Sequence, residues 1–258
     1  MKEVKDGSVR TVVTSPPYWN MYYYGHKEEI GYGQKYEEYL NSLDEVWSKC
    51  YDKLTSNGTL WVNISNKITK GKFNFLASDF ANHITKLGFT LQNVIIWYKP
   101  NAMPMLNKNN FTNKHEYLLF FSKSNDYKFY KDRVRITQKY INLDWGKRKE
   151  KYNSKGKDPG NVWVLSPRKG NLSKSIEHPA PFPRLIPEIS ILSSSDENEI
   201  ILDPFLGTGT TALVGNHLKR NVIGYELNSN FKKLIAETRK LPYKELDFQK
   251  YRIDGLDV

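Results

Sequence analysis

The stretch from Ile200 to Glu226 constrains the fold more than any other part of the chain. Its residues 200–203 are typical of a short buried strand, residues 210–218 have the pattern of a helix, and residues 221–225 form a second apolar run. A strand, a helix and a strand in immediate succession predict a βαβ unit with parallel strands. Because the rest of the chain repeats this alternation, we predict an α/β fold with a doubly wound, mostly parallel sheet.

The remaining elements follow from the same periodicities. We expect strands at residues 9–14, 59–63, 91–97 and 116–122, and helices at residues 36–54, 74–87, 188–194 and 230–240. Asn57 and Gly58 are expected to form a turn before the strand that begins at Thr59. A length of 258 residues suits one domain, which we expect to span residues 1–258 with a small insertion inside it.

The loop after residues 200–203 has the composition of a ligand-binding turn. It runs Asp203-Pro204-Phe205-Leu206-Gly207-Thr208-Gly209-Thr210-Thr211. Two glycines let the backbone approach a ligand closely, and the following helix presents free amides. Glu226 ends the next strand, where a carboxylate can accept hydrogen bonds from ribose hydroxyls. The loop has neither the third glycine of dinucleotide-binding loops nor the lysine of an ATP-binding loop, so it predicts another nucleoside cofactor. A plain tight turn is the alternative.

A second loop, Ser15-Pro16-Pro17-Tyr18, follows the β-branched run at residues 9–14. Proline lacks the amide donor that a central strand needs, so the strand must end there. Open α/β sheets bind their ligands in loops that follow the carboxyl ends of strands. These four residues are therefore candidates for a catalytic site.

The charge of the chain points to an anionic partner. The formal net charge is +11, which favours nucleic acid, although a lysine-rich surface from a biased genome would give the same value. Residues 123–176 are poor in Leu, Ile and Val, and combine aromatic side chains with cations. The candidates for DNA contact are Lys147, Arg148, Lys149, Lys151 and Arg168. We predict a partner-binding insertion, with a disordered loop as the alternative.

Several protein classes are excluded by the composition. The single cysteine, Cys50, rules out a disulfide scaffold and a cysteine-rich metal site, and we expect it to be a small core residue of a helix. We predict no metal site. Apolar runs stay shorter than about 18 residues, and the first residues lack an apolar signal region, so we expect a cytoplasmic protein of a prokaryote or phage.

The two loops, taken in this order, resemble those of the beta group of prokaryotic DNA amino-methyltransferases, in which the catalytic loop precedes the cofactor loop. The resemblance covers nearly the whole chain. It extends to residues 58–63, 96–104, 114–117, 161–163 and 178–183. It implies a Rossmann-like methyltransferase fold, S-adenosylmethionine as cofactor and double-stranded DNA as substrate. A cognate restriction endonuclease that acts on the same site is left open.

The resemblance also assigns residues to roles. Ser15, Pro16, Pro17 and Tyr18 become the catalytic loop, and residues 123–176 the target-recognition region. The cofactor would be bound by the glycine loop, with Glu226 on its ribose and a later segment beside it. These cofactor residues are Asp203, Phe205, Gly207, Thr208, Gly209, Thr210, Thr211, Glu226, Ala180, Pro181 and Phe182.

One feature departs from the family pattern. A strand that ends in an adenine-binding Asp usually precedes the catalytic strand, and here only residues 1–8 precede it. Residues 251–258 followed by residues 1–9 would restore the usual run. We therefore predict a circular permutation between the Asp254 strand and the catalytic strand, with Asp254 in the adenine-binding role. A coincidental acidic tail is the alternative.

The catalytic loop suits methyl transfer to an exocyclic amine. The Ser15 hydroxyl and the Pro16 carbonyl can accept both N–H bonds of the amine, and Tyr18 offers a face for a base flipped out of the duplex. Ser at the first position is commoner among cytosine-N4 enzymes of this family, so we expect cytosine N4. Adenine N6, transfer to RNA or to protein glutamine, and a catalytically inactive DNA-binding module are the alternatives.

Overall fold

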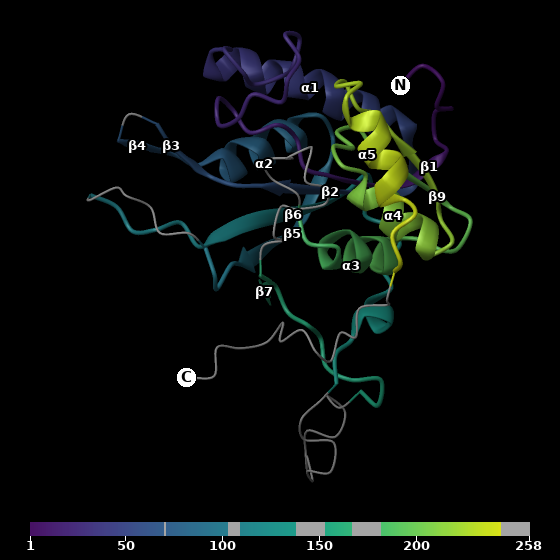
Figure 1. The fold of residues 1–258 in the computed structure, drawn as a ribbon. Helices are drawn as coiled ribbons and strands as arrows, with labels where there is room; N and C mark the ends of the chain where they lie inside the picture. The colour runs from purple at the N-terminus through teal and green to yellow at the C-terminus, as the bar shows by residue number, and fades with distance from the viewer. Residues whose placement is uncertain (70, 103–108, 138–152, 167–181, 244–258) are drawn as a thin grey trace.

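The computed structural model describes residues 1–69, 71–102, 109–137, 153–166 and 182–243. Its centre is a seven-stranded sheet in the order β7-β5-β6-β2-β1-β8-β9 (Figure 1). The strands are β1 (Val9–Thr14), β2 (Leu54–Ile64), β5 (Thr90–Tyr98), β6 (His115–Ser122), β7 (Val162–Val164), β8 (Ile200–Asp203) and β9 (Asn221–Gly224). All neighbours pair in parallel except β6, which is antiparallel to both β2 and β5. The predicted α/β class with a mostly parallel sheet is confirmed.

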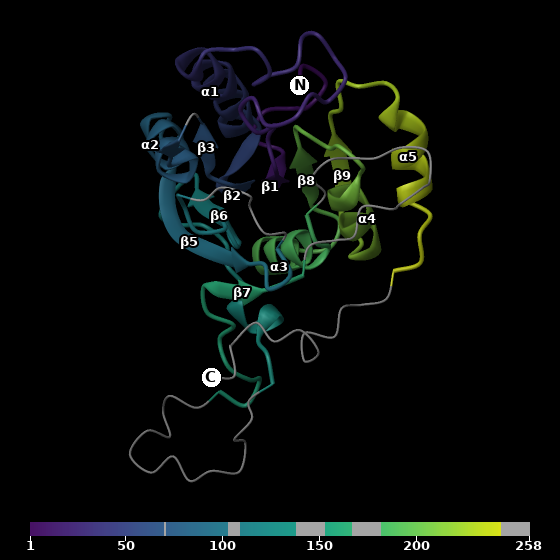
Figure 2. The same ribbon diagram turned by 60° about the vertical axis from the view of Figure 1, so that its left-hand side comes forward.

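Helices cover both faces of this sheet (Figures 1 and 2). They are α1 (Tyr36–Lys53), α2 (Leu76–Lys86), α3 (Leu185–Ser194), α4 (Thr210–His217) and α5 (Phe231–Thr238), with a short 3-10 helix η1 (Lys131–Val134). Helices α1 and α2 pack on one face in a cluster that includes Val12, and α3 and α4 pack on the other in a cluster that includes Val13. Successive strand residues point to opposite faces, so every residue of β1 is buried.

Helix α1 shows how the sequence produces these layers. Its residues Leu43, Trp47 and Cys50 recur at helical spacing and are at most 1% exposed, so one stripe of the helix is buried against the sheet. Glu38 accepts the Lys35 amide at 3.0 Å and so caps the first turn. The expectation that Cys50 is a core residue is confirmed, and burial raises the pKa of its thiol.

The structure corrects the turn predicted at Asn57 and Gly58. Both residues lie within β2, which begins at Leu54, and the pairing with β1 is irregular between Val9 and Thr11. A side chain at Gly58 would meet the Thr55 and Arg10 carbonyl oxygens at 3.0 and 3.1 Å. Gly58 therefore marks a close approach of two strands rather than a chain reversal.

Four short elements were not predicted from the sequence. These are η1, β7 and the hairpin formed by β3 (Lys67–Thr69) and β4 (Lys72–Asn74). Strands of three residues contain too few positions to show a period of two, so tertiary pairing defines them.

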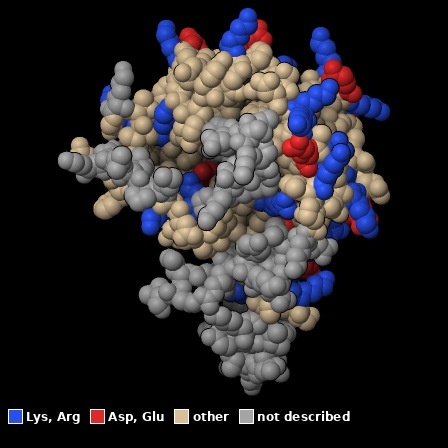
Figure 3. Space-filling model, in the orientation of Figure 1, with Lys and Arg blue, Asp and Glu red and all other residues tan. Residues whose placement is uncertain are grey.

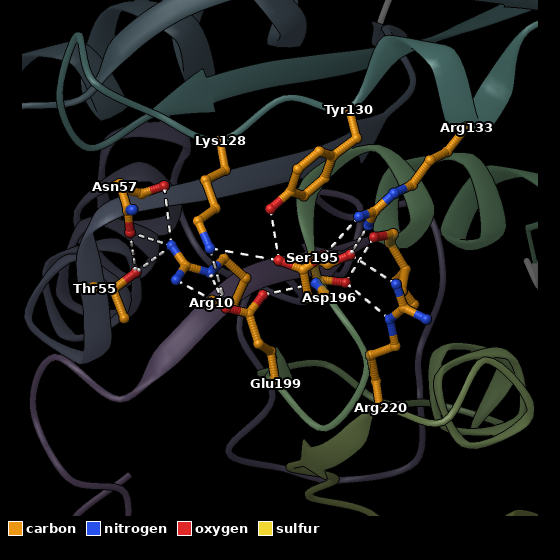
Figure 4. Close-up of polar contacts among 11 residues, drawn as sticks. Arg10, Thr55, Asn57, Lys128, Tyr130, Arg133, Ser195, Asp196, Glu199 and Arg220 are labelled. Carbon is orange, nitrogen blue, oxygen red and sulfur yellow. Dashed lines mark hydrogen bonds and ion pairs between the residues drawn. The ribbon is translucent and has the colours of Figure 1, made fainter.

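A polar network ties the amino edge of the sheet to the chain segment before η1 (Figure 4). Arg10, at the start of β1, donates to Glu199 Oε1 at 2.9 Å and to Thr55 Oγ1 at 3.1 Å. Asp196 accepts hydrogen bonds of 2.6 Å from Tyr130 and from Arg133. Residues 130–133 are thereby docked on the loop that follows α3.

No helix in the described part of the chain is long and apolar enough to cross a membrane. Among the same residues, no group of three or more His, Cys, Asp or Glu side chains is arranged to hold a metal ion.

Candidate functional site

The two loops singled out by the sequence meet at one cavity. Strands β1 and β8 are adjacent and parallel, so Ser15 and Pro204 emerge at the same carboxyl edge of the sheet. The cavity has a volume of about 370 Å³. Its lining residues are Ser15, Pro16, Pro17, Tyr18, Tyr24, Glu28, Glu29, Ile30, Phe182, Pro204, Phe205, Leu206, Gly207, Thr208, Thr210, Tyr225, Glu226, Leu227 and Phe231.

The loop after β1 is held from behind by α1. The Tyr39 hydroxyl, fully buried, donates to the Pro17 carbonyl at 2.9 Å. The Met21 amide donates to the Tyr18 carbonyl at 3.1 Å, which closes a turn after the loop. Tyr18 is only 5% exposed. Burial and the nearby Glu116 charge raise the pKa of Tyr18 well above its usual value, so its hydroxyl keeps its proton.

The glycine loop is shaped around Glu226. The Gly207 amide donates to Glu226 Oε2 at 2.8 Å, and the Asn228 amide donates to Oε1 at 2.8 Å. Gly209 precedes α4 with a φ of 83°, in the left-handed region that glycine favours. A side chain at Gly224 would meet Leu206 at 2.7 Å, so the strand and the loop touch. Burial raises the pKa of Glu226.

Asp203 joins the two loops beneath the cavity. Its Oδ1 accepts the Thr14 hydroxyl at 2.6 Å and the Phe205 amide at 3.1 Å. Burial, with a smaller contribution from the Glu226 charge, raises the pKa of Asp203 to about 6. The Asp203 side chain is 1% exposed and sets loop geometry rather than lining the cavity.

The charge of the cavity is opposite to that of the chain. Glu28, Glu29 and Glu226 line it, and no Lys or Arg does so among the described residues, although the formal net charge of the chain is +11. Apolar and aromatic side chains such as Phe205, Phe231 and Leu227 form much of the remaining wall. The cavity therefore suits a ligand with an aromatic part and a positive charge.

The sequence profile of one family, described as DNA methylase (N6_N4_Mtase), matches residues 9–237. The chain belongs to this DNA methylase family. The match includes the loop Ser15-Pro16-Pro17-Tyr18, the glycine loop and the strand that ends before Glu226.

Curated relatives and solved structures agree with the assignment. The methylase is 32% identical to the type II methyltransferase M.BglII of Bacillus subtilis over 89% of its own length and 63% of that relative's. It is 31% identical to M.Cfr9I of Citrobacter freundii, over 90% and 81% of the two lengths. The chain thus spans just under two thirds of M.BglII.

Two solved structures share the fold. The cytosine-N4-specific PvuII DNA methyltransferase aligns with a TM-score of 0.73 at 22% identity, over 93% of the methylase and 82% of that chain. A candidate DNA modification methylase of Thermus thermophilus, solved with S-adenosyl-L-methionine, aligns with a TM-score of 0.60 at 25% identity, over 93% and 90% of the two chains.

The structure brings most of the predicted site residues of the methylase together. Ser15, Pro16, Pro17, Tyr18, Phe182, Phe205, Gly207, Thr208, Thr210 and Glu226 line the cavity. Asp203 ends β8, Gly209 directly precedes α4 and Thr211 lies in the first turn of α4, and none of the three lines the cavity. Ala180, Pro181 and Asp254, and the predicted DNA contacts Lys147, Arg148, Lys149, Lys151 and Arg168, lie outside the described residues.

Sequence reasoning missed the wall formed by Tyr24 and residues 28–30. This segment has neither helical nor strand periodicity, so no signal marked it. The structure fixes it through side chains, because Glu29 Oε2 accepts the Tyr24 amide at 2.8 Å and Asn228 Nδ2 donates to the Tyr24 carbonyl at 2.7 Å. Phe231 and Leu227, also missed, follow Glu226 closely in the chain.

Proposed function

We propose that this methylase transfers a methyl group from S-adenosylmethionine to the exocyclic N4 of cytosine in duplex DNA. Membership of the DNA methylase family, and the similarity to type II methyltransferases, support the coarser activity, which is transfer of a methyl group to an amino group of DNA. The observation that carries the proposal is the shared cavity, which is lined both by Ser15 and Tyr18 and by the glycine loop and Glu226.

The residues of the cavity fit S-adenosylmethionine. When bound, this cofactor supplies an electrophilic methyl group on a positively charged sulfur. The Glu226 carboxylate would accept hydrogen bonds from the ribose hydroxyls, and the glycine loop would hold the methionine end. Glu28 and Glu29 add negative charge that favours a cationic ligand, and Phe205 and Phe231 offer apolar surface for an adenine ring.

The catalytic loop would orient the amine that receives the methyl group. The lone pair of an exocyclic amine is delocalised into the base, so the nitrogen is a weak nucleophile. Two acceptors, the Ser15 hydroxyl and the Pro16 carbonyl, would bind its N–H bonds and stabilise the positive charge that develops on nitrogen. Tyr18 would stack against a base flipped out of the duplex. In such a direct transfer a new N–C bond would form at the amine nitrogen as the C–S bond of the cofactor breaks, and the nitrogen would then release a proton to solvent.

Ser15 favours cytosine N4 over adenine N6, because in the family Ser at this position accompanies cytosine-N4 enzymes more often than adenine-N6 enzymes. Adenine N6 is the second candidate, since the geometry of two acceptors and one aromatic face serves either amine. The measurement below separates the two.

Exposed aromatic side chains beside the catalytic loop are suited to DNA. Tyr23 and Tyr32 follow the loop, are 56% and 54% exposed, and have ring centroids 5.0 Å apart. On the β3–β4 hairpin, Phe73 is 61% exposed. The hairpin is fastened to the loop because Lys67 Nζ donates to the Trp19 carbonyl at 2.7 Å. Such faces stack on bases without sequence preference.

Cationic side chains are spread over the face in Figure 3 rather than gathered in one patch of it. Contacts to phosphates are therefore expected from several elements, and from residues 123–176, the proposed target-recognition region. Because each phosphate contact releases counterions, DNA affinity should fall steeply with salt. Salt-insensitive binding would contradict this part of the proposal.

The deciding experiment uses labelled S-adenosylmethionine and unmethylated DNA of broad sequence content, followed by digestion to nucleosides. Label in N4-methylcytosine supports the proposal. Label in N6-methyladenine would show that adenine is the target base, with the same transfer mechanism. Ser15→Ala, which removes one acceptor, serves as the inactive control. Cofactor binding without any transfer would favour an inactive DNA-binding module.

A further inference from the structure

A buried carboxylate lies directly behind the catalytic loop. Glu116, in β6, is 9% exposed, and its two oxygens accept three hydrogen bonds. Oε2 accepts the Tyr18 hydroxyl at 2.9 Å and Asn63 Nδ2 at 3.0 Å, and Oε1 accepts Lys99 Nζ at 2.9 Å. The donors come from the catalytic loop, from β2 and from the segment after β5.

Such a group is expensive to bury unless it is fully paired. A carboxylate removed from water loses several kcal/mol of hydration unless donors replace the solvent. Lys99 compensates the charge, with side chains 16% and 11% exposed for Lys99 and Glu116. The donors Asn63 and Lys99 also fix the orientation of the carboxyl plane, so Oε2 points at Tyr18.

We propose that Glu116 is a positioning residue for methyl transfer: it holds the Tyr18 ring and, through the Tyr18 hydroxyl, leaves the Ser15 oxygen free to accept the amine. The inference rests on the proposed function, because it assumes that Ser15 accepts an N–H bond.

The direction of the hydrogen bonds follows from the chemistry of each group. An ionised carboxylate can only accept, so the Tyr18 proton is committed to Glu116. The Tyr18 oxygen is then left to accept, and Ser15 Oγ donates to it across a long contact of 3.4 Å. With its own proton turned toward Tyr18, Ser15 presents lone pairs to the cavity. The buried negative charge two hydrogen bonds away also polarises the chain toward greater acceptor strength at Ser15.

The Glu116 charge also acts on two tyrosines that follow Tyr18 in the chain. It contributes to raising the pKa of Tyr22 and of Tyr24, in both cases after burial. These phenols therefore keep their protons, and for Tyr24 the Glu29 carboxylate contributes as well.

The test is a double-mutant cycle on kcat, measured with the whole chain at saturating DNA and cofactor. Glu116→Gln is expected to lower kcat roughly tenfold to a hundredfold, less than the ~10²–10³ typical for a donor that touches the reacting atoms. The KM for DNA and the Kd for S-adenosylmethionine should stay within about twofold of wild type. Tyr18→Phe should lower kcat similarly, and adding Glu116→Gln to it should cause little further loss.

A purely structural role gives a different pattern, in which Glu116→Gln lowers kcat equally with and without the Tyr18 hydroxyl. That additive result, or an unchanged kcat, overturns the proposal. If Glu116→Gln does not fold, Glu116→Asp keeps the charge but withdraws it from Tyr18, and the same cycle applies. Glu199→Gln, at the opposite edge of the sheet, is the matched control and should retain full kcat. A wild-type chain that transfers no methyl group would instead refute the proposed function.

Discussion

The Tyr18 hydroxyl donates a 2.9 Å hydrogen bond to Glu116 Oε2, although the two residues are 98 positions apart in the chain. Tyr18 belongs to the loop after a parallel strand, and Glu116 to the one strand of the sheet that runs antiparallel to both its neighbours. The bond fastens the loop that follows β1 to β6. The geometry of the Ser15–Tyr18 loop thus depends on β6, a strand that belongs to neither the Ser15–Tyr18 loop nor the glycine loop.

Glu226→Gln is expected to weaken binding of S-adenosylmethionine about tenfold or more, because hydrogen bonds to a charged group contribute ~1.5–3 kcal/mol. Isothermal titration with the cofactor measures the change. Glu197→Gln removes an exposed carboxylate paired with Lys219 and should leave the affinity unaltered. If both variants bind S-adenosylmethionine with equal affinity, Glu226 does not contact the cofactor.

Asp254→Ala tests the predicted permutation. If Asp254 binds the adenine of the cofactor, its loss should weaken cofactor binding well over tenfold. Asp257→Ala changes a second acidic residue of the same tail and is the control. If Asp254→Ala binds S-adenosylmethionine as tightly as wild type does, Asp254 does not bind the adenine, and the resemblance of the acidic tail to the family's strand is coincidental.

Asp203 should make the stability of the cofactor-free chain depend on pH. Its folded pKa of about 6 lies above the ordinary 3.8, so the protonated form favours folding, and this contribution is lost as pH rises from about 4 through 6. The difference corresponds to about 3 kcal/mol. Asp203→Asn should therefore gain thermal stability relative to wild type as pH rises from 4 to 7.

The measurement for Asp203 is the melting temperature of both proteins across that pH range. The exposed Asp126→Asn, measured beside it, accounts for the removal of a carboxylate outside the core. A difference between Asp203→Asn and wild type that stays constant with pH would show that Asp203 does not ionise in this window.

Arg10→Met should destabilise the fold by about 3 kcal/mol, because it leaves the partly buried Glu199 without its main partner. Lys219→Met breaks the exposed pair with Glu197 and should change stability by less than about 1 kcal/mol. Urea unfolding of the two variants compares them. Equal effects would mean that the network in Figure 4 contributes no more than a surface ion pair.

Phe73→Ala and Lys72→Ala should weaken DNA binding in distinguishable ways. Loss of a stacking ring lowers affinity without changing its salt dependence, whereas loss of a phosphate contact reduces the slope of log Kd against log salt by about one. Titration of labelled duplex at several salt concentrations gives both numbers. Neither variant should alter the affinity for S-adenosylmethionine. If both variants bind DNA as tightly as wild type does, the β3–β4 hairpin does not contact DNA.

Local chemistry explains what the sequence by itself determined. Strands that end in Ser15-Pro16 and in Asp203-Pro204, and a glycine pair that opens a helix, follow from backbone rules that act within a few residues. The fold class, the two loops and the buried Cys50 could therefore be predicted. The loops could also be expected at one edge, because parallel strands end on the same side of a sheet.

Tertiary structure decided the rest, since it depends on contacts between distant residues. Only pairing between strands shows that β6 is antiparallel and that Asn57 and Gly58 continue β2. Only packing brings Glu28 and Glu29 to the cavity and Glu116 behind Tyr18. A side chain's partners across space leave no periodic trace in the sequence, because periodicity records which face is buried and not what it is buried against.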